Sequence, residues 1–274
     1  MTDIEKPIKR GIVRQFLGKE FYILKRKLNW VFGAEKWAKN KSEESFEFDV
    51  FHHKSMILRP LKDVEMYLQE NKRTNLKIAI AHLNGIIIKP GETFSIWRLV
   101  GRPTKVKGYL EGLVLKQGQT AKDTGGGLCQ LGNLLFWIFA HSPLTITERY
   151  RHGFDVFPDL NRKVPFGAGA TLSYNHIDLQ IKNETENTFR IGLWLDQTHL
   201  NGVLQCDVRL KSKFRIEERN HLMKQQYWGG YSRHNQIVQI ETDLEEYETE
   251  KLLVENHAVM MYNPFLTNEE KTKR

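Results

Sequence analysis

The sequence has few cysteines: Cys129 and Cys206 are the only two among its 274 residues. Two thiols do not make a disulfide-built secreted scaffold, and neither lies in a metal-ligand pattern. No uninterrupted apolar run is long enough to cross a bilayer. Lys9, Arg10 and Arg14 interrupt every candidate signal-peptide core. We therefore expect a cytoplasmic protein with no metal site and no cofactor.

Excess positive charge is nearly absent outside the N-terminal region. Residues 1–41 carry eleven Lys or Arg and four Asp or Glu, which is a net +7 of the formal +8 of the chain. The high isoelectric point thus belongs to an N-terminal arm and not to the folded domain. A nucleic-acid-binding domain would carry its basic patch on the fold itself, so we expect no nucleic-acid partner.

The arm has the apolar spacing of an amphipathic helix from about Ile12 to Lys39. One face collects apolar residues at spacings of three and four: Val13, Leu17, Phe21, Leu24, Leu28 and Val31. Such a basic helix can lie on an anionic membrane, here at its inner face. Alternatively, it packs on its own domain and leaves the basic face in solvent. We favour packing on the domain and keep the peripheral membrane contact as the alternative.

The remaining pattern divides the chain into residues 1–44, a basic helical arm and linker, residues 45–250, the main domain, and residues 251–274, a C-terminal tail. The fold class predicted is α+β, with a mostly antiparallel β-sheet packed on a buried central helix. Strands are expected at residues 144–150, 179–182, 189–195, 204–210 and 236–242. Asn201-Gly202 is a typical two-residue hairpin turn. We therefore expect the chain to turn there, between the strands at residues 189–195 and 204–210.

The central helix is predicted to start at the Gly125-Gly-Gly-Leu-Cys129 turn. Leu128, Leu131, Leu134, Leu135, Ile138 and Phe139 follow with helical spacing, and Ser142-Pro143 ends the run. A cysteine in the first turn is near the positive end of the helix dipole, which lowers the pKa of its thiol. Bare glycine amides would form an oxyanion hole. The alternative is a glycine-rich loop beside an inert, buried cysteine.

A nucleophilic thiol needs a base, and five histidines are candidates for it: His141, His152, His176, His199 and His257. We choose His152, because a strand that returns beside the cysteine helix would bring it near the helix start. Asp155 and Asp159 follow closely and would orient the imidazole. Arg149, Arg151 and Arg162 surround this segment and suit an anionic group of a substrate. If Cys129 is not catalytic, His152 and the aspartates and arginines around it would belong to an ordinary solvated loop.

Several motifs in the same order resemble the VanW family, which takes its name from an accessory protein of vancomycin-resistance clusters. They are Lys89-Pro-Gly-Glu-Thr-Phe-Ser, Thr124-Gly-Gly-Gly-Leu-Cys-Gln-Leu, Glu148-Arg-Tyr-Arg-His-Gly-Phe-Asp-Val-Phe-Pro-Asp, Arg162 and Pro165-Phe-Gly-Ala-Gly-Ala-Thr. Some VanW domains are thought to be cysteine-dependent L,D-transpeptidases acting on peptidoglycan stem peptides. The resemblance implies Cys129 as nucleophile and His152 as base. Asp155 is our third catalytic residue, and the expected substrate-binding residues are Gly125, Gly126, Gly127, Gln130, Arg149, Arg151, Asp159 and Arg162.

Two hypotheses follow for the function. The first is acyl transfer through Cys129, with a stem-peptide-like amide or ester as donor and water or an amine as acceptor. The second is an accessory protein that binds a peptidoglycan-precursor-like ligand without chemistry. In both, the expected partner is a peptidoglycan stem peptide or precursor.

Overall fold

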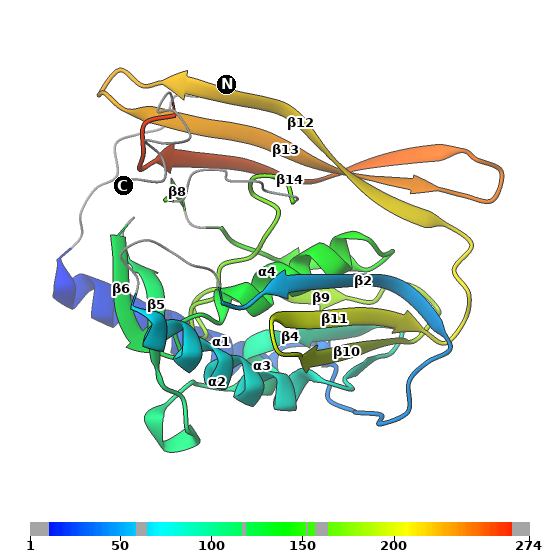
Figure 1. Ribbon diagram of the computed structural model, residues 1–274. Helices are drawn as coiled ribbons and strands as arrows, with labels where there is room; N and C mark the ends of the chain where they lie inside the picture. The colour runs from blue at the N-terminus through cyan, green and yellow to red at the C-terminus, as the bar shows by residue number, and fades with distance from the viewer. Residues whose placement is uncertain (1–10, 59–64, 117–118, 152, 157–163, 265–274) are drawn as a thin grey trace.

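The computed structural model describes residues 11–58, 65–116, 119–151, 153–156 and 164–264. The helices are α1 (Ile12–Phe32), α2 (Met66–Leu83), α3 (Ile96–Val100) and α4 (Cys129–Ala140), with a 3₁₀ turn at Lys105–Lys107. The strands form mostly antiparallel sheets around these helices (Figure 1). This confirms the predicted α+β class.

Among the described residues, the β structure consists of three four-stranded sheets and one hairpin. The first sheet has the order β1 (Lys36–Trp37), β4 (Glu92–Ser95), β9 (Gln180–Lys182), β7 (Thr145–Glu148). The second has the order β2 (Phe48–Met56), β11 (His199–Cys206), β10 (Phe189–Leu195), β3 (Ile87–Ile88). The third has the order β12 (Lys213–Gln225), β13 (Tyr231–Thr242), β14 (Glu248–Met260), β8 (Phe154–Asp155). The hairpin joins β5 (Glu111–Lys116) and β6 (Gln119–Thr124).

Helix α4 is the buried central helix that the sequence predicts, and it packs against β2 and β11. The close approach explains Gly202, which lies within β11. A Cβ atom there would stand 2.7 Å from both Leu134 Cδ2 and Ile138 Cδ1 of α4. The predicted Asn201-Gly202 hairpin turn is therefore wrong: Gly202 makes room for a helix instead of turning the chain.

The turn between β10 and β11 lies at residues 196–198 instead. One carboxylate oxygen of Asp196 accepts the backbone N–H groups of Thr198 at 2.7 Å and His199 at 2.6 Å. A side chain that binds backbone amides two and three residues ahead replaces the glycine that a two-residue turn would need.

Strands β12, β13 and β14 form a long antiparallel sheet that lies above α4 in Figure 1. Gln239 of β13 joins the two layers, because its Nε2 donates to the carbonyls of Ala140 at 2.7 Å and Ser142 at 2.9 Å, at the end of α4. Residues 251–260, expected to belong to a C-terminal tail, form much of β14. The proposed division of the chain into domains stays a prediction.

Helix α1 is shorter than the sequence predicts. Helix α1 ends at Phe32, because Gly33 follows in an extended conformation and the chain then enters β1. Helix α2 runs without a break through Asn75. The Asn75 side chain is fully buried and makes its hydrogen bonds to the neighbouring loop.

Candidate functional site

The Gly125-Gly-Gly turn leads into α4 as predicted, and each glycine has a reason in the fold. Gly125 and Gly127 have φ values of +78° and +92°, which side-chain-bearing residues rarely adopt. Gly126 lies so close to Gly112 that a Cβ atom would overlap the backbone of that residue. Conformation and packing therefore explain why these positions are glycine, whether or not a ligand binds there.

The glycine amides are already used, which corrects the expected oxyanion hole. Gly125 N–H donates to Leu110 at 2.9 Å, Gly126 N–H to Asp123 at 3.1 Å and Gly127 N–H to Leu113 at 3.0 Å. They are thus not free to bind a substrate carbonyl. In the part of the chain that the structure describes, the amides of Leu128 and Cys129 have no backbone acceptor, so these two remain as candidate oxyanion donors.

Asn75 of α2 holds the glycine turn through its side chain, and the sequence did not predict this role. Its Nδ2 donates to the carbonyls of Leu110 and Gly126, both at 3.0 Å, while its Oδ1 accepts the Leu110 N–H at 2.8 Å. The side chain is fully buried. The hydrogen bonds of this one buried amide thus hold α2 against both Leu110 and the glycine turn. The only sequence signal was a polar residue in the apolar part of a helix.

Cys129 is the first residue of α4 and is exposed to solvent. Its sulfur contacts the backbone of Leu172, accepting the N–H at 3.5 Å and donating to the carbonyl at 3.7 Å. Although solvent reaches the residue, the surrounding protein is dense enough that desolvation raises the pKa of the thiol. The amides of Leu172 and of Cys129 itself lower this pKa by less. The direction is opposite to the predicted lowering, because desolvation outweighs the hydrogen bonds from these two amides.

The second glycine loop, residues 165–171, packs on the first turns of α4. Asn133 of α4 accepts the Ala170 N–H at 3.0 Å. Arg149 holds the same loop, donating to the carbonyls of Gly169 at 2.8 Å and Gly167. The loop then continues to Leu172 beside the sulfur. The position of the Cys129 thiol thus depends on this loop.

Arg149 and Arg151 were expected to bind an anionic group of a substrate, and both lie against the loop. Arg149 also donates to Asn256 Oδ1 at 3.0 Å, so its Nε and Nη2 are occupied by protein acceptors. Arg151 stacks its guanidinium 4.6 Å from the ring centre of Phe166. Burial lowers the pKa of Arg149, and the positive charge of Arg151 adds to this effect. These contacts support the loop; a role in substrate binding stays a prediction.

Asp155 lies in β8, the edge strand of the third sheet. Its carboxylate accepts a 2.9 Å hydrogen bond from the hydroxyl of Tyr262 and stands 3.5 Å from Arg233 Nη1. Asp155 is buried. The ion pair and the strand pairing give it a structural role in attaching β8 to β14.

The proposed base His152, together with Asp159 and Arg162, lies outside the described residues. The other four candidate histidines have partners elsewhere. His141 hydrogen-bonds to Trp137, and His257 hydrogen-bonds to His234. The ring of His176 contacts the ring of Tyr22, and His199 lies within ion-pair distance of Asp196. His141 caps the far end of α4, about 18 Å along the axis from Cys129 at 1.5 Å per residue. Tyr150, two residues before His152, accepts the Thr171 N–H at 2.8 Å, next to Leu172.

Gln130 joins α4 to β2. Its Nε2 donates to the Met56 carbonyl at 2.8 Å and to the Ser55 hydroxyl at 3.0 Å. The side chain therefore fixes the helix against the second sheet, and substrate binding by Gln130 stays a prediction.

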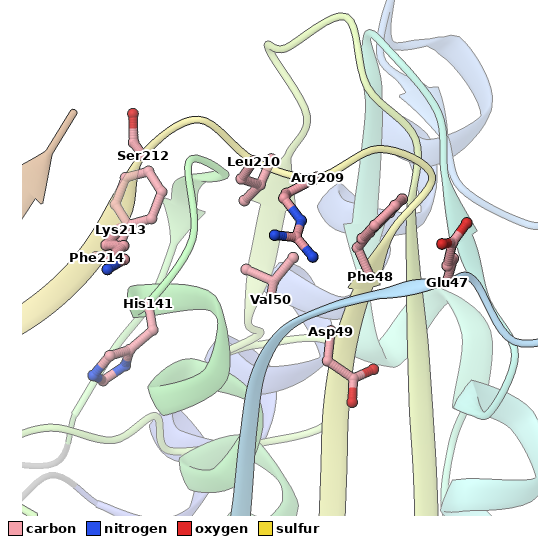
Figure 2. A pocket seen from close by; sticks show the side chains of 10 residues that line it. All are labelled: Glu47, Phe48, Asp49, Val50, His141, Arg209, Leu210, Ser212, Lys213 and Phe214. Carbon is pink, nitrogen blue, oxygen red and sulfur yellow. The ribbon is translucent and has the colours of Figure 1, made fainter. Parts of the chain in front are cut away.

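A pocket of about 490 Å³ lies at the opposite end of α4 from Cys129 (Figure 2). It is formed by residues 47–50, His141, residues 209–210 and residues 212–214. Figure 2 shows Phe48, Val50 and Leu210 around the guanidinium of Arg209, with the carboxylate of Asp49 pointing away from them. No residue predicted for the site lines it, so it does not extend the cysteine site. Across the described residues, no three or more His, Cys, Asp or Glu side chains gather as a metal site would require.

The fold and site together define an α+β protein in which a free, exposed cysteine opens a buried helix behind a glycine turn. A family model described as "VanW like protein" matches residues 71–204. This match includes Asn75, the glycine turn, Cys129 and the loop at 165–171. The chain belongs to the VanW-like family.

Two curated proteins show the similarity in detail. Vancomycin B-type resistance protein VanW of Enterococcus faecalis is 38% identical over 180 residues, which are 66% of this chain and 66% of that protein. The uncharacterized protein YoaR of Bacillus subtilis is 29% identical over 118 residues, which are 42% of this chain and 36% of that protein. The chain thus spans just under two thirds of the first relative and about a third of the second. No solved structure matches the chain.

Proposed function

We propose that this protein acts in the cell-wall process to which glycopeptide resistance belongs, and that Cys129 transfers an acyl group from a peptidoglycan stem peptide. The proposal takes its biological setting from the 38% identity to a protein named for vancomycin B-type resistance. The observation that carries the chemistry is an exposed thiol at the first residue of α4, next to backbone amides.

The reaction has two steps. A base, for which we propose His152, takes the Cys129 proton, and the thiolate attacks the donor carbonyl. The donor C–N bond breaks, the leaving amine takes the proton, and a thioester remains on the sulfur. An acceptor amine or water then attacks the thioester, the C–S bond breaks, and the sulfur regains a proton. The amides of Leu128 and Cys129 are the donors we propose for the developing oxyanion.

The raised thiol pKa favours a second function. A thiol that stays protonated is a poor nucleophile without an effective base. The glycine amides are also occupied. The protein could then bind a stem-peptide-like ligand and act without chemistry. In this case Cys129 contributes packing against Leu172 and no covalent step.

Trapping the acyl intermediate separates these functions. The full chain is incubated with a stem-peptide analogue that carries a D-alanine amide or ester, and intact mass is measured after rapid acid quenching. Acyl transfer predicts an added acyl mass in the wild type and in Cys206→Ala, but none in Cys129→Ala. His152→Ala should reduce the rate of adduct formation at least tenfold.

Binding of the same analogue by calorimetry is the matched measurement. Full affinity in Cys129→Ser, with no adduct in the wild type, would support the binding function and overturn acyl transfer. Equal adduct rates in the wild type and His152→Ala would remove His152 as base while leaving Cys129 as nucleophile.

A further inference from the structure

Helix α1 presents its apolar stripe to solvent. We define the stripe as Val13, Leu17, Phe21, Leu24, Leu28 and Val31, and each of these residues is between 47% and 72% exposed. Phe16 and Phe32 add exposed aromatic surface near the two ends of the helix. Scattered single apolar residues are normal on a surface, but a contiguous stripe over the full length of a helix marks an interaction site. This reverses the expectation that the helix packs its apolar face on the domain.

The opposite face of α1 is attached to the domain, so the exposed stripe does not result from a detached helix. Ile23 is buried, and Trp30 packs against the core. Arg26 makes two hydrogen bonds of 2.7 Å to the carboxylate of Glu148 and a third, of 3.0 Å, to the Asn175 carbonyl. These contacts fix the rotation of the helix about its axis. The stripe is therefore held facing outward.

Basic side chains border the stripe. At about 100° per residue, Arg14 and Lys25 lie along one edge and Lys27 along the other. All three are exposed. Glu20 is the single acidic residue between Ile12 and Phe32. An apolar band with cations on both sides matches the boundary between the acyl chains and the phosphates of an anionic bilayer.

We infer that α1 docks this protein on an anionic lipid surface, with the stripe inserted at the acyl-chain boundary and Arg14, Lys25 and Lys27 at the lipid phosphates. Within the described residues, no helix is long and apolar enough to cross a membrane. Because its opposite face is attached to the domain, α1 would lie in the plane of the surface. Figure 1 shows α1, in blue, well away from the tip of the β13–β14 hairpin. The family match at residues 71–204 does not include α1, and the docking does not depend on chemistry at Cys129.

Flotation of the full chain with vesicles tests the docking. Vesicles of equal parts phosphatidylglycerol and phosphatidylcholine are compared with pure phosphatidylcholine. The wild type should float with the anionic vesicles and bind the neutral ones at least tenfold more weakly. Leu17→Glu combined with Leu24→Glu should reduce binding to anionic vesicles more than tenfold. Lys25→Glu and Lys27→Glu should each reduce it at least about fivefold, with a smaller salt dependence.

Matched controls lie on the β13–β14 hairpin, where Leu244 is 76% exposed and Lys251 is exposed. Leu244→Glu and Lys251→Glu should bind vesicles as the wild type does. Failure of the wild type to float, or equal binding by the stripe variants, would overturn the docking. So would a dimer in sedimentation that Leu17→Glu with Leu24→Glu makes monomeric while vesicles stay unbound, because a second copy would then cover the stripe.

Discussion

Arg26 of α1 and Glu148 of β7 form a bidentate ion pair, with each of two guanidinium nitrogens 2.7 Å from its own carboxylate oxygen. The residues are 122 positions apart, and the pair joins the N-terminal helix to the first sheet. Glu148 Oε1 also accepts the backbone N–H of Asp178 at 2.9 Å, and Arg26 Nη1 stands 3.8 Å from the Asp178 carboxylate. One arginine therefore compensates two acidic groups in a largely desolvated place.

Replacing this arginine should loosen α1. Arg26→Ala leaves the Glu148 and Asp178 carboxylates without their cation, and losing one partner of such a pair costs about 3 kcal/mol of the free energy of unfolding. Hydrogen exchange should accelerate over residues 12–32 and stay unchanged over α4. Lys25→Ala, at an exposed neighbouring position, is the control and should change neither quantity. Unchanged exchange in Arg26→Ala would show that Ile23 and Trp30 hold the helix without the ion pair.

The glycine turn should not tolerate a side chain at position 126. In Gly126→Ala the added Cβ overlaps the Gly112 backbone, so the beginning of β5 must move away from the turn. Overpacking of this kind costs about 3 kcal/mol. Urea denaturation gives the free energy of unfolding directly. Gly153→Ala is the control, because no atom of the described residues lies within 4 Å of a Cβ at Gly153. This variant should stay within about 0.5 kcal/mol of the wild type.

Local sequence signals predicted the start of α4 and little of what surrounds it. Three glycines followed by an apolar run at helical spacing define a turn and a helix through neighbouring residues alone. Asn75, Leu172 and Gly112 act on that turn from distant parts of the chain. Nothing in a single sequence gives their proximity, so the occupied glycine amides and the raised thiol pKa were not predicted.

The strands β12 and β14 escaped prediction for a related reason. Most side chains of β12 are exposed or half-buried, and polar residues occupy both of its faces. Polar and apolar residues alternate only over residues 213–217 of β12, so period-two reasoning does not detect a strand of 13 residues. The predicted hairpin turn at Asn201-Gly202 was wrong for the opposite reason. The local signal for a hairpin was strong, but packing of β11 against Leu134 and Ile138 determined the role of that glycine.

The reactivity of Cys129 should depend on pH as a desolvated thiol does. Desolvation raises its pKa, so the thiolate fraction is small at neutral pH and grows only above about pH 8.5, the ordinary value for cysteine. In a Cys206→Ala background, the rate of alkylation by iodoacetamide is measured between pH 6 and 10. The midpoint should lie above that of free cysteine in the same buffer. A midpoint below it would mean that the helix start and a nearby base dominate over desolvation.

Asp178 should make the protein less stable as pH rises through the mildly acidic range. The carboxyl is fully buried, and desolvation raises its pKa to about 6, although Ser95, Arg26 and the Trp97 amide act in the opposite direction. Below about pH 4 the group is protonated in both the folded and unfolded states and burial costs no ionisation energy. Between about pH 4 and pH 6 the unfolded chain releases this proton while the folded protein retains it, so unfolding becomes easier.

The integrated loss of stability from this carboxyl is about 3 kcal/mol, and it is constant above about pH 6, where both states are ionised. Asp178→Asn keeps an oxygen to accept the Trp97 and Leu179 amides but cannot ionise. Its free energy of unfolding, measured with urea from pH 4 to pH 7, should fall less with pH than that of the wild type. Glu44→Gln, at an exposed position, should follow the wild-type curve. If Asp178→Asn also followed it, the buried carboxyl would have to be ionised already at pH 4, with Arg26 outweighing desolvation.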